Sequence, residues 1–148
     1  MHINSLTLED CEEAARLHQN AFFKGWSKKD FQEFLQNSLT HGLKIEASNS
    51  IYGYILWREV EDEAEILTLV VVPAYQRTGI GSLLLKVLSE VIIKKGITKL
   101  FLEVAEDNTQ AQLFYHKHNF ILLSKRPNYY QREKSKFVAA LNFFKILL

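Results

Sequence analysis

The residues best suited to do chemistry lie in one turn, Gln76-Arg77-Thr78-Gly79-Ile80-Gly81, which joins a strand-like apolar run to an apolar helical pattern. The first N–H groups of a helix have no partner within the helix, and they carry the positive end of its dipole. Glycines let a ligand approach those N–H groups closely, and Arg77 adds a positive charge. The turn therefore indicates an anion site suited to phosphate, although two glycines can also serve turn geometry alone.

The common phosphate motifs do not fit this turn. It lacks the Gly-Lys-Ser/Thr of a P-loop, and Leu84 stands where the Rossmann pattern requires its third glycine. The turn also falls midway along the chain, after a run of strands that read as antiparallel. These features argue against NTP hydrolysis and against NAD binding.

The elements that must position this turn follow from hydrophobic periodicity, which predicts seven strands and four helices in one domain, residues 1–148. We expect strands near His2–Leu6, Leu43–Ala47, Tyr52–Val60, Ala64–Val72, Lys99–Val104 and Phe120–Lys125, and a last one within Lys136–Phe144. We expect helices over Leu8–Phe22 and Lys28–Leu39, from Ile80 to Ile92, and over Thr109–His118. The order β-α-α-β-β-β-α-β-α-β-β is that of a mixed α/β domain.

Four residues at helix ends support the helix limits predicted above. Thr7 and Ser27 are typical helix caps, and Gly96 stands where the long helix should end. Asn119 follows the last helix, and we expect it to take a left-handed conformation there, since asparagine tolerates that conformation best after glycine.

The composition narrows the function classes. The chain is 47% hydrophobic and 24% charged, with 18 Lys plus Arg against 17 Asp plus Glu, so a net charge of +1 calls for neither nucleic acid nor a membrane surface. The single cysteine, Cys11, is expected as a small buried hydrophobe in a reducing compartment. With no signal peptide and no long apolar run, we expect a cytoplasmic protein.

The histidines show no spacing typical of metal ligands, so no metal is implied. His116 and His118 are expected to be exposed at a helix end, where a positive charge favours the helix dipole.

Several motifs together resemble a known family. The turn Gln76–Gly81 resembles the acetyl-CoA pyrophosphate loop of the Gcn5-related N-acetyltransferases (GNAT), and Leu102-Glu103-Val104 with Asn108–Ala111 and Phe114-Tyr115 resembles the second half of that fold. Further pieces resemble the RimI type, the bacterial ribosomal-protein alanine N-acetyltransferases: His18-x-x-x-Phe22 with Trp26-Ser27, Asp62-Glu63-Ala64 and Arg126-x-Asn128-Tyr129-Tyr130. The resemblance runs from Leu6 to about Tyr130. It implies a mostly antiparallel twisted sheet with one splayed parallel strand pair, flanked by about four helices.

The resemblance also implies roles for individual residues. For the cofactor acetyl-CoA they are Leu69, Val70 and Val71 along the pantetheine, Arg77, Thr78, Gly79, Ile80, Gly81 and Ser82 around the pyrophosphate, and Asn108 at the cap of the last helix. Glu103 is the implied base and Tyr115 the implied acid, while Trp26 and Tyr130 flank the acceptor. The physical argument agrees for the strands, because parallel strands that part expose N–H and C=O groups that need partners.

The implied chemistry is attack of a neutral amine on a thioester. An α-amine with a pKa of about 7.7–8.0 is neutral in roughly a tenth or more of molecules at pH 7, whereas a lysine is neutral in about one in two thousand. An α-amine is therefore the easier acceptor. Glu103 would need burial or a water relay to act as the base, because an ordinary carboxylate is a weak one. Proton transfer from the Tyr115 phenol to a thiolate costs about 2 kcal/mol unless the site tunes it.

Other interpretations stay open at this point. Glu103 can be a surface charge at a strand end, Tyr115 a half-buried core aromatic, and Trp26 and Tyr130 structural aromatics. The leading hypothesis is acetylation of a protein N-terminus, such as that of a small-subunit ribosomal protein beginning with alanine. The alternatives are a lysine or small-molecule amine as acceptor, and a CoA-binding sensor without activity. We expect a monomer or weak dimer.

The segment after Tyr130 departs from the family pattern. Gln131-Arg132-Glu133-Lys134-Ser135-Lys136 replaces the usual acidic and small residues, and an apolar run, Phe137–Leu148, follows. These differences indicate an unusual acceptor loop and a C-terminus that is packed or covered by a partner.

Overall fold

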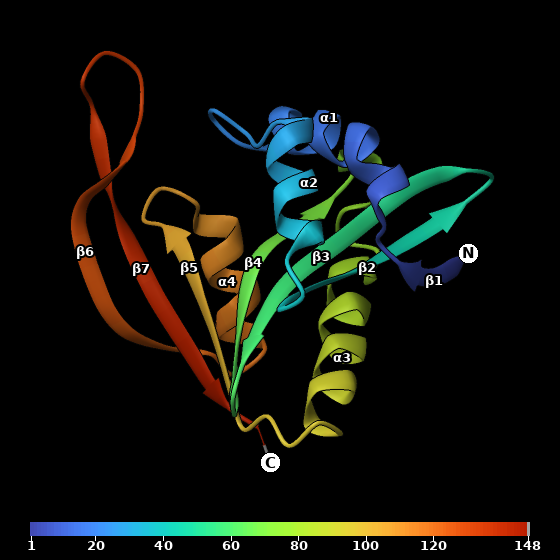
Figure 1. The fold of residues 1–148 in the computed structure, drawn as a ribbon. Helices are drawn as coiled ribbons and strands as arrows, with labels where there is room; N and C mark the ends of the chain where they lie inside the picture. Colours follow the sequence, from blue (N-terminus) through green and yellow to red (C-terminus); the bar gives the residue numbers. More distant parts are fainter. Residues whose placement is uncertain (148) are drawn as a thin grey trace.

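The computed structural model describes residues 1–147 as a single seven-stranded sheet with helices on both faces (Figure 1). The strand order is β1-β2-β3-β4-β5-β7-β6, and only β4 and β5 run parallel. The strands are β1 (His2–Ser5), β2 (Thr40–Ala47), β3 (Ser50–Val60), β4 (Glu63–Val71), β5 (Lys99–Ala105), β6 (Ile121–Gln131) and β7 (Phe137–Ile146). The helices are α1 (Cys11–Ala21), α2 (Lys28–Gln36), α3 (Ile80–Ile93) and α4 (Thr109–Lys117), with 3-10 turns at Leu8–Asp10 and Pro73–Tyr75.

Two hydrophobic cores lie on opposite faces of the sheet. Helices α1 and α2 bury one face, where Cys11, Ala14 and Phe31 are fully enclosed. Helices α3 and α4 bury the other face, through Leu84, Leu88 and their neighbours. Both stripes follow the helical spacing predicted from the sequence. One position differs on α3, since Leu83 is 42% exposed while Leu85 is buried.

The parallel pair β4–β5 separates after four residues. Pairing runs from Glu63 with Lys99 to Ile66 with Leu102 and goes no further. At the same point β4 contains a bulge, because Ile66 lies opposite Trp57 and Thr68 opposite Leu56, which leaves Leu67 without a partner on β3. The bulge reverses the side-chain alternation of β4 and bends it away from β5. Figure 1 shows the resulting opening between the two strands.

The helix ends behave largely as predicted. Asn119 takes φ +70°, and the N–H groups of Asn119 and Phe120 donate to the carbonyls of His116 and Tyr115, which completes a Schellman motif. Gly96 takes φ +82° at the end of α3. Ser27 caps α2 by accepting from the Asp30 N–H at 3.1 Å.

The helical boundaries predicted for α1 and α2 were partly wrong. The first helix begins as a 3-10 turn at Leu8–Asp10 and becomes α-helical only at Cys11. The second ends at Gln36 and not at Leu39, because the Asn37 side chain accepts from the Leu39 N–H at 2.9 Å and turns the chain toward β2.

The last hairpin is longer than predicted and projects from the sheet (Figure 1). The sequence predicted a strand over Phe120–Lys125, but β6 runs from Ile121 to Gln131. Pro127 is tolerated because β6 is an edge strand with an irregular register between Arg126 and Tyr130. The partner strand β7 ends at Ile146, two residues beyond the predicted limit.

The apolar C-terminal run is paired within the sheet and partly packed, since Phe137 and Ile146 stay about half exposed. Strand β7 lies between β5 and β6, and Phe143 and Leu147 are buried. Leu148, the last residue of the run, lies outside the described residues. Across residues 1–147, the helices are all too short or too polar to cross a membrane.

Candidate active site

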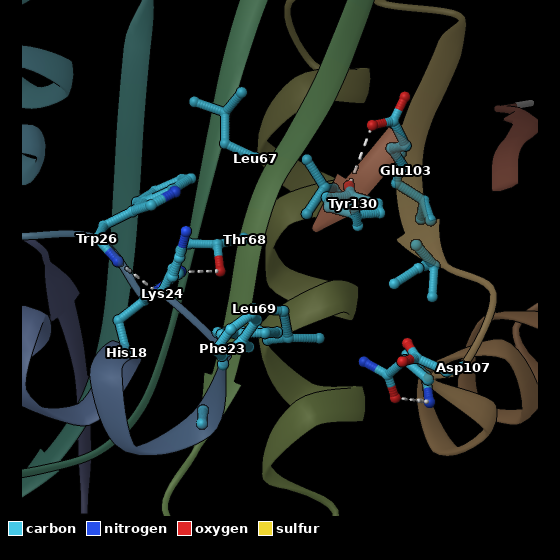
Figure 2. Close-up of a pocket in the computed structure, with 18 of the residues that line it drawn as sticks. His18, Phe23, Lys24, Trp26, Leu67, Thr68, Leu69, Glu103, Asp107 and Tyr130 are labelled. Carbon is cyan, nitrogen blue, oxygen red and sulfur yellow. Dashed lines mark hydrogen bonds between the residues drawn. The ribbon is translucent and has the colours of Figure 1, made fainter. Parts of the chain in front are cut away.

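A cavity of about 620 Å³ occupies the opening between β4 and β5 (Figure 2). Six residues selected from the sequence line it: Trp26, Leu69, Glu103, Asn108, Tyr115 and Tyr130. The remaining selected residues do not: the Val70 side chain is buried against α1 and α2, and Val71, the last residue of β4, lies beside Gly81 of the turn Arg77–Ser82. The structure therefore separates the candidate site into a cavity and an adjoining helix N-terminus.

Glu103 projects into the cavity from β5. Its neighbours in the sequence, Leu102 and Val104, are buried. Its carboxylate accepts a hydrogen bond of 3.0 Å from the Tyr130 hydroxyl and one of 3.2 Å from Arg126. The Glu103 side chain is 21% exposed. Burial, and after it the nearby Glu103 charge, raises the pKa of Tyr130. The Tyr130 hydroxyl therefore stays protonated and acts as the donor in its hydrogen bond to Glu103. Figure 2 shows this contact across the cavity.

Tyr115 lies on α4, on the side of the cavity where that helix packs beneath the sheet. It is 6% exposed, with its ring edge-on to Phe114 and Phe120. Burial raises the pKa of Tyr115, so the phenol is protonated at neutral pH. Asn108 begins the helix, and its side chain accepts from the Ala111 N–H at 3.1 Å. The cap predicted at Asn108 is thus confirmed, and it fixes where α4 starts at the cavity edge.

The turn before α3 presents a helix N-terminus to the opening. Gly79 takes φ +92° as the N-cap, and its carbonyl accepts the first helical bond, from the Leu83 N–H at 2.9 Å. The N–H groups of Ile80, Gly81 and Ser82 precede that bond and have no helical partner. Arg77, at φ +64°, lies in the same turn. This arrangement can hold an anion.

The two glycines of the turn serve different purposes. A Cβ on Gly79 would meet nothing within 4 Å, so that glycine is needed for its left-handed backbone. A Cβ on Gly81 would lie 3.3 Å from the Phe114 ring, so this glycine lets α3 approach α4 closely. Sequence analysis interpreted both glycines as access for a ligand, with turn geometry as the alternative, and turn geometry holds for Gly79.

His118 does not take the exposed position predicted for it. It is half-buried, and its Nε2 lies 2.9 Å from the Ser82 hydroxyl. Burial, together with Lys117 and Lys145, lowers the pKa of His118. The contact joins the N-terminus of α3 to the C-terminus of α4, so the Ser82 hydroxyl is already engaged by a protein side chain.

His18 is a cavity residue for which sequence analysis predicted no role. The Trp26 N–H donates to His18 Nδ1 at 3.0 Å, so the ring proton is on Nε2, which lies 3.1 Å from the Thr68 hydroxyl. Burial lowers the pKa of His18 to about 4. Trp26 stacks on this neutral ring, with centroids 4.5 Å apart. The His18-x-x-x-Phe22 pattern marked the position, but only the fold brings it to Thr68.

The mouth of the cavity is bordered by charged residues from separate elements. Lys24, in the loop after α1, donates to Gln131 at the end of β6 at 2.9 Å. Arg132 pairs with Asp107 through two contacts of 2.7 and 2.8 Å, and this pairing lowers the pKa of Asp107. These pairs are 25 or more residues apart in the chain, and no local pattern in the sequence indicates them. Within residues 1–147, His, Cys, Asp and Glu side chains form no group of three that could hold a metal ion.

Comparisons with known proteins agree with one another. A model of the Acetyltransferase (GNAT) family matches residues 11–120. The chain is 32% identical over 130 residues to the [ribosomal protein bS18]-alanine N-acetyltransferase of Haemophilus influenzae, and this match covers 88% of each of the two chains. It superposes on the crystal structure of the ribosomal-protein-S18-alanine N-acetyltransferase from Escherichia coli with a TM-score of 0.89 at 28% identity, covering 99% of this chain and 93% of that one. The Arabidopsis thaliana NAA60 structure in complex with acetyl-CoA shares the fold, with a TM-score of 0.85 at 15% identity over 99% and 98% of the two chains.

Proposed function

The chain belongs to the acetyltransferase (GNAT) family, whose members use acetyl-CoA, and on that premise we propose that it acetylates the α-amine of a protein N-terminus. The observation that carries the proposal is the pair Glu103 and Tyr115, which line one cavity from different elements where β4 and β5 part. Relatives of this chain are named for acetylating the alanine of ribosomal protein bS18, and we propose a ribosomal protein, in the cytoplasm, as the acceptor.

The residues around the opening fit acetyl-CoA. Beyond Ile66, the backbone of Leu67–Val71 has no strand partner on the β5 side, among the residues described. Such groups suit the amides of a pantetheine arm. The turn Arg77–Ser82, with its free N–H groups, suits the pyrophosphate. We assign Leu69, Val70 and Val71 to the first role, through their backbone, and Asn108 to the cavity edge beside them.

The proposed proton transfers use Glu103 and Tyr115. The bound thioester supplies an acyl carbon that a neutral amine can attack. We propose that Glu103 takes the proton that the amine loses, directly or through a water molecule, while Tyr130 and Arg126 hold the carboxylate in place. We propose that the Tyr115 hydroxyl gives its proton to the departing sulfur. No metal ion is needed for these steps.

The proposed acceptor groove passes Trp26 and Tyr130. Trp26 is fixed by its stacking on His18, and Tyr130 by its bond to Glu103. An α-amine that reaches Glu103 must therefore pass between the loop after α1 and the end of β6, since both line the cavity.

The test is an acceptor panel with acetyl-CoA. It includes peptides beginning with Ala, Ser or Met, an N-terminally blocked peptide with an internal lysine, and free polyamines, with CoA release as the readout. We expect release with the free N-terminal peptides and none with the blocked peptide. The variant Glu103→Gln, which keeps the size of the side chain but cannot take up the proton, should lower turnover with the same acceptor preference.

Two results would contradict the proposal. Release with the blocked peptide or the polyamines alone would make the acceptor a lysine or small amine. Binding of acetyl-CoA by isothermal titration, without release for any acceptor, would favour a CoA-binding sensor.

A further inference from the structure

The mouth of the cavity is bridged by a single lysine. Lys24 extends from the loop between α1 and α2, and its Nζ donates to the Gln131 Oε1 at 2.9 Å. Both residues line the cavity, one from each side of the proposed acceptor path (Figure 2 labels Lys24). An acceptor that reaches Glu103 must therefore pass close to the Lys24 ammonium group.

The loop that carries Lys24 is held in place by α1. The Trp26 N–H donates to His18, and the Trp26 carbonyl accepts from the Gln19 side chain at 3.0 Å. Gly25 lies so close to α1 that a Cβ there would be 2.6 Å from the backbone of Gln19. Lys24 itself has φ +52°, a conformation that non-glycine residues adopt only where their surroundings enforce it. The position of the Lys24 backbone is thus built into the fold, and the bond to Gln131 directs its side chain across the mouth of the cavity.

The charge of Lys24 is not neutralised by a carboxylate. Four charged residues line the cavity, and Glu103, Asp107 and Arg132 are each in an ion pair. Lys24 forms none within residues 1–147, because its partner Gln131 is neutral. The neighbouring segment Ser124–Lys136 has five basic residues against one acidic residue, but three of the five, Lys125, Arg126 and Arg132, are in ion pairs with carboxylates. The unpaired charge of the cavity lining, within residues 1–147, is therefore that of Lys24, and an acidic group of an acceptor can replace the Gln131 carbonyl there.

The position of Lys24 along the acceptor follows from β6. Tyr130 bonds to Glu103, and the next residue, Gln131, bonds to Lys24. One residue of extended chain advances by about 3.3 Å. If the amine lies at Glu103, the side chain that meets Lys24 is then one or two residues beyond the N-terminal one.

We propose that Lys24 is a specificity-determining residue, which selects acceptors with an acidic side chain at the second or third position. The inference rests on the proposed function, because it presumes that a peptide N-terminus reaches Glu103. Lys24 would contact the acidic side chain of the acceptor equally in the bound substrate and in the transition state. The selection should therefore act on KM and leave kcat little changed.

The test compares peptides of matched shape with the whole enzyme and acetyl-CoA. Peptides with Asp at position two or three are paired with peptides that have Asn at the same position, and Lys peptides are paired with Gln peptides. We expect wild type to favour Asp over Asn by roughly two- to fivefold in kcat/KM, mainly through KM. The preference should weaken between about 0.05 M and about 0.5 M salt, because screening shortens the range of the interaction.

Three variants separate Lys24 from the general charge of the hairpin. Lys24→Met should bring the Asp-to-Asn ratio close to one, and Lys24→Glu should make the enzyme favour Lys over Gln. Lys134→Met removes the same charge from another exposed lysine with a left-handed backbone, φ +48°, outside the cavity lining, and it should keep the preference for Asp.

The outcomes are distinct. Acetylation of all peptides with an Asp-to-Asn ratio near one in wild type would overturn this inference and leave the proposed function standing. An equal loss of preference in Lys24→Met and Lys134→Met would also overturn it, since the selection would then come from the net charge of the region. Acetylation of none of the peptides would overturn the proposed function and this inference together.

Discussion

Two hydroxyl groups and one carboxylate define the chemistry of this cavity at the scale of single residues. The Tyr130 hydroxyl is committed to Glu103, whereas, within residues 1–147, the Tyr115 hydroxyl has no hydrogen-bond partner in the protein. A phenol is ordinarily a weaker acid than a thiol, and burial raises the pKa of Tyr115 further. Transfer of its proton to sulfur is therefore uphill, and we expect it to occur together with cleavage of the carbon–sulfur bond.

Removal of the Tyr115 hydroxyl tests its proposed role as the acid. Tyr115→Phe keeps the ring that packs against Phe114 and Phe120, so acetyl-CoA affinity by isothermal titration should stay close to wild type. Turnover should fall by about 10²–10⁴-fold, the usual contribution of a general acid. Tyr129→Phe is the matched control, because Tyr129 is exposed and lies outside the cavity lining. Unchanged turnover in Tyr115→Phe would mean that water or another group protonates the thiolate.

His18 links pH to stability. Its pKa is about 4 in the folded protein, below the ordinary value of 6.5, so between these values the unfolded chain binds a proton that the folded protein does not. The free energy of unfolding should therefore fall as the pH drops from about 6.5 to about 4, by up to about 1.4 kcal/mol per pH unit from this group.

Urea melts across this pH range measure the effect. His18→Gln should be less stable at pH 7, where it loses the neutral ring, but its stability should decline less steeply with falling pH than that of wild type. His2→Gln, which changes an exposed histidine, should follow the wild-type slope. Parallel curves for wild type and His18→Gln would show that the His18 protonation is not linked to folding.

At the scale of elements, the end of α4 determines where Tyr115 lies. The Schellman motif at Asn119 stops the helix and sends Phe120 into the core, where it is 1% exposed. The Ser82–His118 contact and the close approach of Gly81 to Phe114 then hold α4 against α3. The position of the proposed acid thus depends on contacts outside the cavity.

Substitution of Asn119 tests this dependence. Asn119→Gly should keep turnover and change stability little, because glycine accepts φ +70° without strain. Asn119→Val should lower the free energy of unfolding by roughly 1–2 kcal/mol, because a β-branched residue is strained there. Urea melts and turnover of both variants are the measurements. Loss of turnover in Asn119→Gly with an unchanged melt would assign the side chain a direct part in the reaction.

At the scale of the whole molecule, the sheet is held together as two parts that meet at the paired residues of β4 and β5. Below that point four residue pairs join the strands, and above it the strands part around the cavity. A ligand that binds between them would complete the sheet. It would also stabilise the fold by mass action, by about 2.7 kcal/mol at a hundred times its Kd.

Hydrogen exchange with and without acetyl-CoA tests this completion. We expect slower exchange for amides within residues 67–71, beyond the general stabilisation that any ligand gives. Amides of residues 64–66 already face a paired β5 and serve as the internal reference. Equal slowing in the two segments would indicate that the cofactor does not occupy the opening between the strands.

The sequence by itself determined the class of fold and the position of the motifs. Helical stripes such as that of α3, the cap at Ser27 and the left-handed Asn119 depend on local chemistry, and the structure confirms them. The GNAT resemblance supplied the rest of the topology, and the strand order and the structural neighbour bear it out.

Only the tertiary structure decided which side chains meet. The bulge at Leu67 arises from the pairing of β4 with β3, and β6 can extend through Pro127 because it lies at the edge of the sheet. The contacts His18–Thr68, Ser82–His118 and Lys24–Gln131 each join elements that are far apart in the chain. Such contacts depend on long-range packing, which leaves no periodic trace in the sequence. For the same reason, only the folded protein shows that His18 is neutral and that Lys24, within residues 1–147, forms no ion pair.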